Sequence, residues 1–67
     1  MKGKKVLCVS QKLYDLMNDF NRKNNVRHGV ILSEDIIHGV KYFFVRVEGY
    51  RKGYDRQLFR PDEIIIL

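Results

Sequence analysis

The sequence predicts a single, mainly β domain of five strands, with one amphipathic helix inserted between the first two strands. Three observations support this prediction. The chain has only 67 residues, which is enough for one domain spanning residues 1–67. Its second half is rich in the β-branched and aromatic residues that favour strands. One stretch near the N-terminus repeats apolar residues at helical spacing.

The first two elements are expected before residue 25. Lys4 to Val9 predicts a short, nearly continuously apolar strand. Ser10 suits a helix N-cap, because its hydroxyl can accept a hydrogen bond from a free N–H of the first turn. We expect a helix from about residue 11 to residue 22, ended by Asn24-Asn25. Its apolar face is expected to pack into the core through Leu13, Leu16, Met17 and Phe20.

Four more strands are expected, at residues 26–33, 40–49, 54–60 and 64–67. The pair Ile36-Ile37 either extends the first of these or begins a turn at His38-Gly39. Gly53 can adopt the positive φ of a turn. Arg60 precedes proline and should be extended. Pro61-Asp62-Glu63 fits one tight or 3₁₀ turn, since proline fixes φ.

The C-terminal run Ile64 to Leu67 bears on how the sheet is completed. Four apolar residues would make an adhesive edge if they were left unpaired. We therefore expect them to pair inside a closed sheet or against another subunit. This expectation favours a barrel or an intermolecular sheet.

Three segments carry a resemblance to a known fold. Arg27-His28-Gly29-Val30-Ile31 resembles a glycine-led second strand, and Tyr42 to Val47 resembles a third strand. Leu58 to Ile64 resembles an ending in which a fourth strand runs through a one-turn 3₁₀ helix into a fifth. In this order the segments resemble an SH3-like small β-barrel. The resemblance implies a closed five-stranded barrel with the helix inserted between strands 1 and 2; the alternative is an open antiparallel α+β sheet with the helix on one face.

The resemblance does not extend to the peptide-binding SH3 domains of signalling proteins. Those domains have an acidic, aromatic-rich first loop and a paired tryptophan, whereas this chain has no Trp. It is more similar to the small barrels of ribosomal, transcription-factor and chromatin-reader proteins, and of phage or prophage proteins. Such barrels mostly bind RNA, DNA or other proteins, and the fold does not choose among these partners.

The charge of the chain is unevenly distributed. There are 13 basic and 8 acidic residues, a net charge of +5. Seven basic and two acidic residues precede Gly29, and six of each sign follow, so all the net charge lies in the first half. A clustered positive field favours nucleic acid or an acidic protein surface as partner. Solubility alone is the other interpretation.

Two basic segments are candidate binding residues. The loop that interleaves aromatic and basic side chains can stack on unpaired bases and neutralise phosphates, or be a solvated hairpin tip. It contains Tyr50, Arg51, Lys52, Tyr54 and Arg56. Lys2, Lys4 and Lys5 could steer the protein to phosphates, or lie in a frayed N-terminal end.

The third strand offers a further candidate surface. Alternation places Phe43, Val45 and Val47 on one face and Tyr42, Phe44 and Arg46 on the other. If the first set faces the core, the aromatic pair on the second is either covered by the helix or exposed. An exposed aromatic patch beside Arg46 would mark an interface.

No catalytic, metal or cofactor site is predicted. Cys8 lies in a predicted buried strand and should be an inert small apolar residue. His28, His38 and Cys8 lack the paired short spacings of a zinc site. The lone thiol, and an N-terminal apolar run too short for a signal peptide, predict a reduced, cytoplasmic protein without a membrane association.

These observations together predict a small non-enzymatic binding module. Nucleic acid or nucleic-acid machinery is the favoured partner, bound through a basic and aromatic surface. The alternative is a protein-binding modulator or inhibitor of phage or mobile-element type, acting through an aromatic β-face. A homo-oligomer formed through a strand edge or the aromatic face is compatible with either function.

Overall fold

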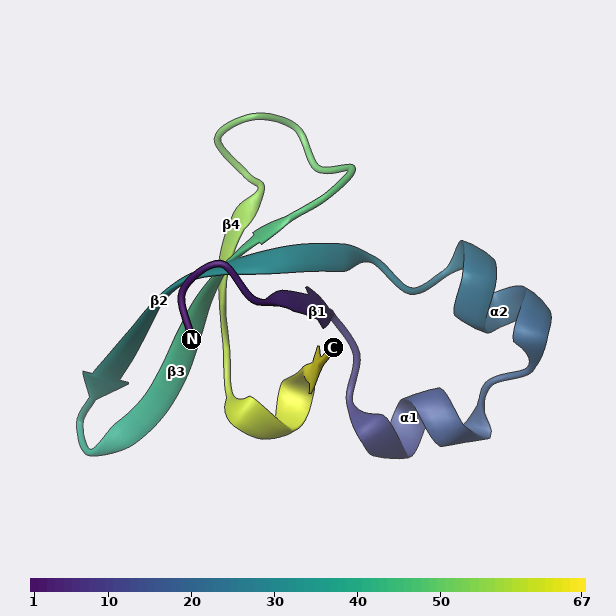
Figure 1. Ribbon diagram of the computed structural model, residues 1–67, viewed down its shortest axis with the longest axis horizontal. Coiled ribbons are helices and arrows are strands. Elements are labelled where there is room, and N and C mark those ends of the chain that lie inside the picture. The colour runs from purple at the N-terminus through teal and green to yellow at the C-terminus, as the bar shows by residue number, and fades with distance from the viewer.

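The computed structural model describes residues 1–67 as one five-stranded antiparallel sheet with short helical connections (Figure 1). The strands are β1 (Lys5–Leu7), β2 (His28–Ile37), β3 (Val40–Val47), β4 (Arg56–Phe59) and β5 (Ile65–Ile66). The helices are α1 (Gln11–Leu16), α2 (Asp19–Asn24) and the 3₁₀ helix η1 (Pro61–Glu63). The prediction of a mainly β chain with five strands is confirmed. None of the three helices has the length and apolar character needed to cross a bilayer.

The sheet is open, so the predicted closed barrel is wrong. The strand order is β4-β3-β2-β1-β5, and no strand pairing joins the edge strands β4 and β5. Closing a sheet requires tilted edge strands that meet along their length. Here β4 has four residues and β5 has two, which leaves too little strand at either edge to meet the other. The C-terminal run pairs with β1 as an edge strand, with Leu7 opposite Ile65.

The local turn chemistry was predicted correctly. Arg60 is extended, with φ −75° and ψ 158°, and Pro61 begins η1. Gly53 has φ 96° in the loop between β3 and β4. The hairpin turn at His38-Gly39 has positive φ at both residues, as a type I′ turn requires. Ile36-Ile37 therefore extends β2 up to this turn.

A register shift divides β2 into two parts. The shift lies between Ile31 and Ser33, where a bulge adds one residue to β2. The first part of β2 pairs with both β1 and β3, whereas the rest pairs with β3 alone. The β2–β3 hairpin therefore extends beyond the other strands (Figure 1).

One face of the sheet carries a small apolar core. It consists of Val6, Ile31, Phe43, Val45, Val47 and Ile64. Cys8 and Phe59 are partly buried against it. The predicted core-facing side of β3 is therefore confirmed, and all three of its residues are buried. We call this side of the sheet the core face and the opposite side the outer face.

Gly29 lies where β2 is closest to its neighbours. A Cβ atom at this position would lie 2.6 Å from Val45 Cγ1 and 3.0 Å from the Arg46 carbonyl oxygen. The carbonyl belongs to the backbone and cannot rotate away. We expect Gly29→Ala to reduce the free energy of unfolding by about 1–3 kcal/mol, which is typical of overpacking. A lower urea midpoint at an unchanged m-value would show this effect; an unchanged midpoint would mean that the strands separate enough to admit the methyl group.

The predicted single helix over residues 11–22 is wrong, because the chain breaks it after Leu16. Ser10 does cap α1, accepting a hydrogen bond from the Leu13 N–H at 3.2 Å. Met17 and Asn18 are then extended, with ψ 147° and 171°. Asparagine is a poor residue for a helix interior but a favoured N-cap.

Asn18 and Arg22 complete the junction between α1 and α2. The Asn18 side chain accepts a hydrogen bond from the Asn21 N–H at 2.8 Å and so begins α2. Arg22 reaches back and donates to the Tyr14 carbonyl at 3.0 Å. Its guanidinium also lies 4.8 Å from the centre of the Tyr14 ring. The two helices are thus held together by side chains of their own segment.

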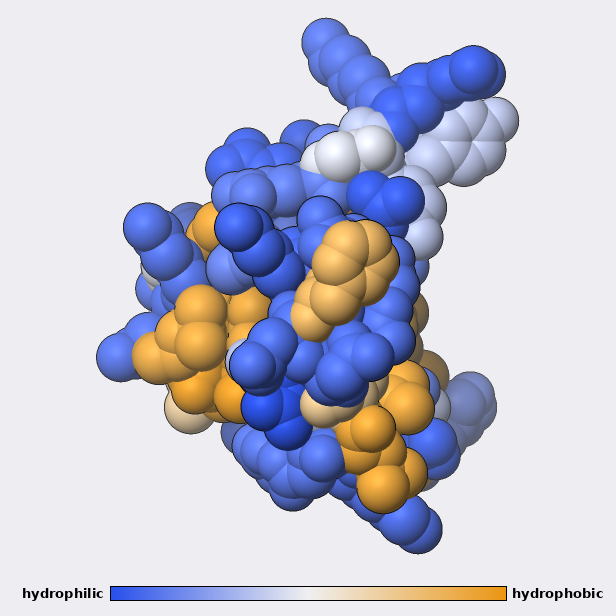
Figure 2. All heavy atoms as spheres, turned by 90° about the vertical axis from the view of Figure 1, so that its right-hand side faces the viewer, coloured by the Kyte–Doolittle hydropathy of each residue, from blue (hydrophilic) through white to orange (hydrophobic).

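The predicted core packing of the helix is also wrong. The side chains assigned to that packing were Leu13, Leu16, Met17 and Phe20. Leu16 is 78% exposed, Phe20 is 72% exposed, and no residue of α1 or α2 is buried. Figure 1 shows the reason, since both helices project away from the sheet instead of crossing its face. Figure 2 faces this projection and shows apolar side chains at the surface among hydrophilic ones. The open-sheet alternative with a helix on one face is therefore wrong about the helix.

Candidate functional site

The outer face of the sheet brings together several residues that the sequence marked as candidates. Alternation along β3 places Tyr42, Phe44 and Arg46 on this face, opposite the buried side chains of the core. Both aromatic residues are half-buried and Arg46 is exposed. Since α1 and α2 project away from the sheet, they do not cover this face.

Three cations lie in one row across the outer face. Lys5 pairs with Val30, Val30 pairs with Arg46, and Arg46 pairs with Arg56. Directly paired residues lie on the same face, so this row crosses four strands. Because neighbouring strands are about 4.8 Å apart, the row spans about 14 Å. We call Lys5, Arg46 and Arg56 the basic row.

The pair Arg46–Arg56 is electrostatically unfavourable in the free protein. Like charges directly opposite one another in a sheet are destabilising. The structure contains five ion pairs, and none of them involves either arginine. Both side chains are exposed at the surface. A bound anion would relieve the repulsion between these two arginines, neither of which has a direct ion pair.

The loop between β3 and β4 adds a third cation beside this pair. An open cleft of about 570 Å³ is lined by Arg46, Lys52, Gly53, Asp55 and Arg56. Its lining has three cations, one carboxylate and no hydrophobic side chain. Gly53 takes φ 96°, a backbone angle that glycine adopts without strain, directly after Lys52. The cleft is therefore a polar, positively charged hollow at the end of the basic row.

An aromatic and apolar row adjoins the basic row. Phe44 lies opposite Ser33 on β2 and opposite Leu58 on β4. Leu58 is exposed. Phe44 lies two residues before Arg46 on the same face of β3, about 7 Å away along the strand. Stacking surfaces next to cations are the combination that binds unpaired bases and their phosphates.

The aromatic and basic loop does not act as one surface. Tyr50 packs on the core side, where the Arg27 guanidinium lies 4.5 Å from the centre of its ring. Tyr50 and Arg27 line a hollow of about 230 Å³ together with the core residues Val47 and Phe59. Only Lys52 and Arg56 of the loop candidates line the cationic cleft. Tyr54 is 70% exposed and Arg51 is exposed, and neither lines a hollow.

The N-terminal segment holds Lys4 and Lys5 against the sheet. Gly3 donates its N–H to the Ile31 carbonyl at 2.7 Å, and the Ile31 N–H donates to the Lys4 carbonyl at 2.9 Å. The alternative of a frayed end is therefore wrong for this segment. Lys4 is exposed just before β1, next to Lys5 at the start of the basic row.

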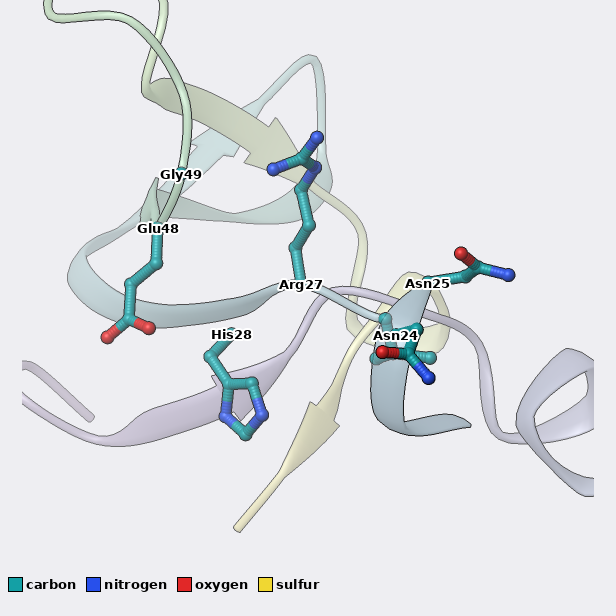
Figure 3. Close-up of a pocket in the computed structure, with 7 residues that line it drawn as sticks. Asn24, Asn25, Arg27, His28, Glu48 and Gly49 are labelled. Atoms are coloured by element: carbon teal, nitrogen blue, oxygen red, sulfur yellow. The ribbon is translucent and has the colours of Figure 1, made fainter. Parts of the chain in front are cut away.

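A third hollow lies beside residues 24–28, where the chain leads into β2. Its volume is about 510 Å³, and its lining is mostly polar. Figure 3 shows that Arg27 extends toward the segment carrying Gly49, whereas His28 and Glu48 point away from that segment. The lining residues are Asn24, Asn25, Val26, Arg27, His28, Glu48 and Gly49. The residues gathered here offer charge and hydrogen bonding to a polar ligand.

Cys8 is half-buried beside the core. Burial raises the pKa of its thiol, and the nearby Glu48 carboxylate raises this pKa further. The thiol is therefore protonated at neutral pH, the form that is a poor nucleophile and metal ligand. No group of three or more His, Cys, Asp or Glu side chains is placed so that it could hold a metal ion.

The sequence alone did not predict the basic row or two of the residues that lie beside it. Val30 and Leu58 lie among the cations and aromatic residues of the outer face, and neither was a candidate. The signal was present in the period-two alternation of each strand, but strand register was needed to align the strands. No protein-family model, curated protein or solved structure matches this chain, so its function is inferred from its own residues.

Proposed function

We propose that this protein binds nucleic acid through the outer face of its sheet, with phosphates on the basic row and bases against the aromatic residues. The pair Arg46–Arg56 carries the proposal, because two adjacent cations that make no ion pair of their own fit an anionic ligand. Lys5 and Lys52 extend the positive surface to either side. The net charge of +5 adds a long-range attraction for a polyanion.

Single strands suit this surface better than duplexes. Phe44 and Leu58 lie on the outer face next to Arg46, and such side chains can contact the face of a base only when that base is unpaired. Neither α1 nor α2 displays the basic face of a helix that reads a major groove, since each is only six residues long. The proposed ligand is therefore a short single-stranded segment of DNA or RNA.

We also infer a distant SH3-like relationship. It is supported by the meandering strand order, by the bulge that bends β2, and by η1 immediately before β5. The sheet is an open variant of that arrangement. Small domains of this kind mostly bind nucleic acid or protein, so the relationship agrees with a binding function without choosing the partner.

The proposal is tested by fluorescence-anisotropy titration of short single- and double-stranded DNA and RNA at several salt concentrations. If Lys5, Arg46, Lys52 and Arg56 all contact phosphates, the slope of log K against log salt for single strands should be about −3. Duplexes should bind more weakly than single strands of the same length. Binding that is absent at low salt, or that does not respond to salt, would contradict the proposal.

The same face favours one alternative function. Ile37, Val40 and Leu58 are exposed on it beside Tyr42 and Phe44, and such a continuous apolar strip suits a protein partner. A protein-binding modulator of phage or mobile-element type would use this strip. It predicts that Phe44→Ala abolishes copurification of a partner while the far-ultraviolet circular dichroism is unchanged.

A further inference from the structure

The segment between β1 and β2 forms a projection that we call the helical arm, residues 10–25. It exposes three large apolar side chains, Leu13, Leu16 and Phe20. Leu13 and Leu16 lie three residues apart on α1 and therefore on one side of that helix, whereas Phe20 lies on α2 beyond the break. Leu16 and Phe20 are more than 70% exposed, and Leu13 is 52% exposed. Single exposed apolar residues are common on protein surfaces, but three of them on one short projection are unusual.

The molecule as a whole exposes more surface than a compact chain of its size. Its accessible surface is 5178 Å², whereas a compact protein of 8.0 kDa is expected to expose about 4,450 Å². The excess is about 700 Å², close to the roughly 800 Å² that each partner buries in a stable interface of standard size. Its radius of gyration is 12.0 Å, compared with about 11 Å for a compact domain of this length.

The charges of the helical arm fit a second copy of the same arm. Lys12, Arg22 and Lys23 balance Asp15 and Asp19 to within one charge. The arm therefore carries both signs at nearly zero net charge, so a second copy of the same surface is not repelled. The outer face of the sheet has the opposite character, since its cations would repel a second copy.

The arm is also held in one shape before any partner binds. Arg22 links α2 to the Tyr14 carbonyl and ring, and Asn18 caps α2. A preformed surface loses less conformational entropy on association than a flexible one. The arm therefore has the order expected of an interface instead of the looseness of an unused loop.

We propose that the protein forms a two-fold symmetric homodimer through the helical arm. The two α1 helices lie antiparallel across the axis, with the leucines of one copy against those of the other. This orientation sets Lys12 of each copy against Asp15 of its partner. The dimer supplies the additional burial that a 67-residue chain with one cysteine cannot obtain from an internal disulfide. It leaves the outer face of both sheets free.

Sedimentation equilibrium and light scattering test the dimer directly. The wild-type chain should have twice its 8.0 kDa mass, and Leu16→Lys should have the monomer mass with an unchanged circular dichroism spectrum. The matched control is Ile36→Lys, because Ile36 is 77% exposed but lies at the β2–β3 hairpin. This control should remain a dimer. A monomeric wild type at the highest soluble concentration would overturn the proposal, as would a Leu16→Lys protein that stays dimeric.

A charge exchange tests the orientation of the two arms. Lys12→Asp alone places like charges together and should weaken the dimer by at least tenfold. The double variant Lys12→Asp with Asp15→Lys restores opposite charges across the axis and should recover most of that loss. If the double variant is no tighter than the single one, the arms do not pair in this orientation.

Discussion

Replacing both Arg46 and Arg56 with glutamine is expected to remove about half of the salt dependence of nucleic-acid binding. If four cations contact phosphates, the slope of log K against log salt for a single strand should change from about −3 to about −1.4. Affinity at low salt should fall by at least tenfold, because two charge-assisted contacts to phosphates are lost. The measurement is anisotropy titration of the same oligonucleotide at a series of salt concentrations.

The same double variant should not lose stability. Arg46 and Arg56 are directly opposed like charges, so neutralising them removes a repulsion from the sheet. Glutamine keeps a polar side chain with an aliphatic stem at each exposed position, so little packing is lost. The urea midpoint should therefore stay the same or rise while the affinity falls. Opposite changes in stability and affinity would identify the pair as serving a ligand instead of the fold.

The matched control is the double variant Lys23→Gln with Lys41→Gln. It also removes two positive charges, but Lys23 lies on α2 and Lys41 projects from the core side of β3. Its salt slope should remain close to the wild-type value. If both double variants reduce the slope equally, binding follows the net charge of the protein, and the outer face is not the binding surface.

Local sequence features correctly predicted the helix cap and the turns of this fold. Ser10 caps a helix, Pro61 begins a 3₁₀ turn, and Gly53 takes a positive φ. Each of these depends on the covalent chemistry of one residue and its nearest neighbours. The alternation along β3 was also predictive, because it places Phe43, Val45 and Val47 on one face, and all three are buried.

Features that depend on distant contacts were predicted less well. The apolar spacing of Leu13, Leu16 and Phe20 indicates a stripe, but does not say what will cover it, and here the sheet does not. Asn18 shows the same limit at short range, because asparagine is compatible with either a helix interior or an N-cap. In the structure Asn18 caps α2, and the contact of Arg22 with the Tyr14 carbonyl holds the two helices in this arrangement. Closure of the sheet depended on the lengths of both edge strands, which no single segment encodes.

The basic row was hidden from the sequence for a related reason. Lys5, Arg46 and Arg56 are aligned by the register of four strands. A shift of one residue would move a side chain to the other face, and β2 does contain such a shift between Ile31 and Ser33. Candidate residues could be named one by one, but their alignment required the pairing of the strands.

Truncating Ile31 to alanine is expected to unfold much of the protein at ordinary temperatures. Ile31 is 0% exposed and lies in the six-residue core cluster. Removing a buried isoleucine side chain to Cβ typically costs about 2–5 kcal/mol. A domain of this length has a total stability of roughly 3–10 kcal/mol. The loss is therefore comparable with the whole free energy of unfolding.

Urea denaturation followed by circular dichroism measures this effect, and Ile31→Val provides a milder variant for the case in which the alanine protein does not fold. The valine change should cost about 0.5–1.5 kcal/mol. The control is Ile36→Ala in the same strand, which removes the same atoms from a side chain that is 77% exposed. It should change stability by no more than about 0.5 kcal/mol.

The comparison of Ile31 with Ile36 also bears on how the protein associates. A large loss at Ile31 alone would locate the stabilising burial of β2 before the bulge, as the core cluster implies. Equal losses at both positions would mean that the β2–β3 hairpin is itself buried in solution. A second copy would then cover the hairpin instead of the helical arm, because no other part of the chain covers Ile36.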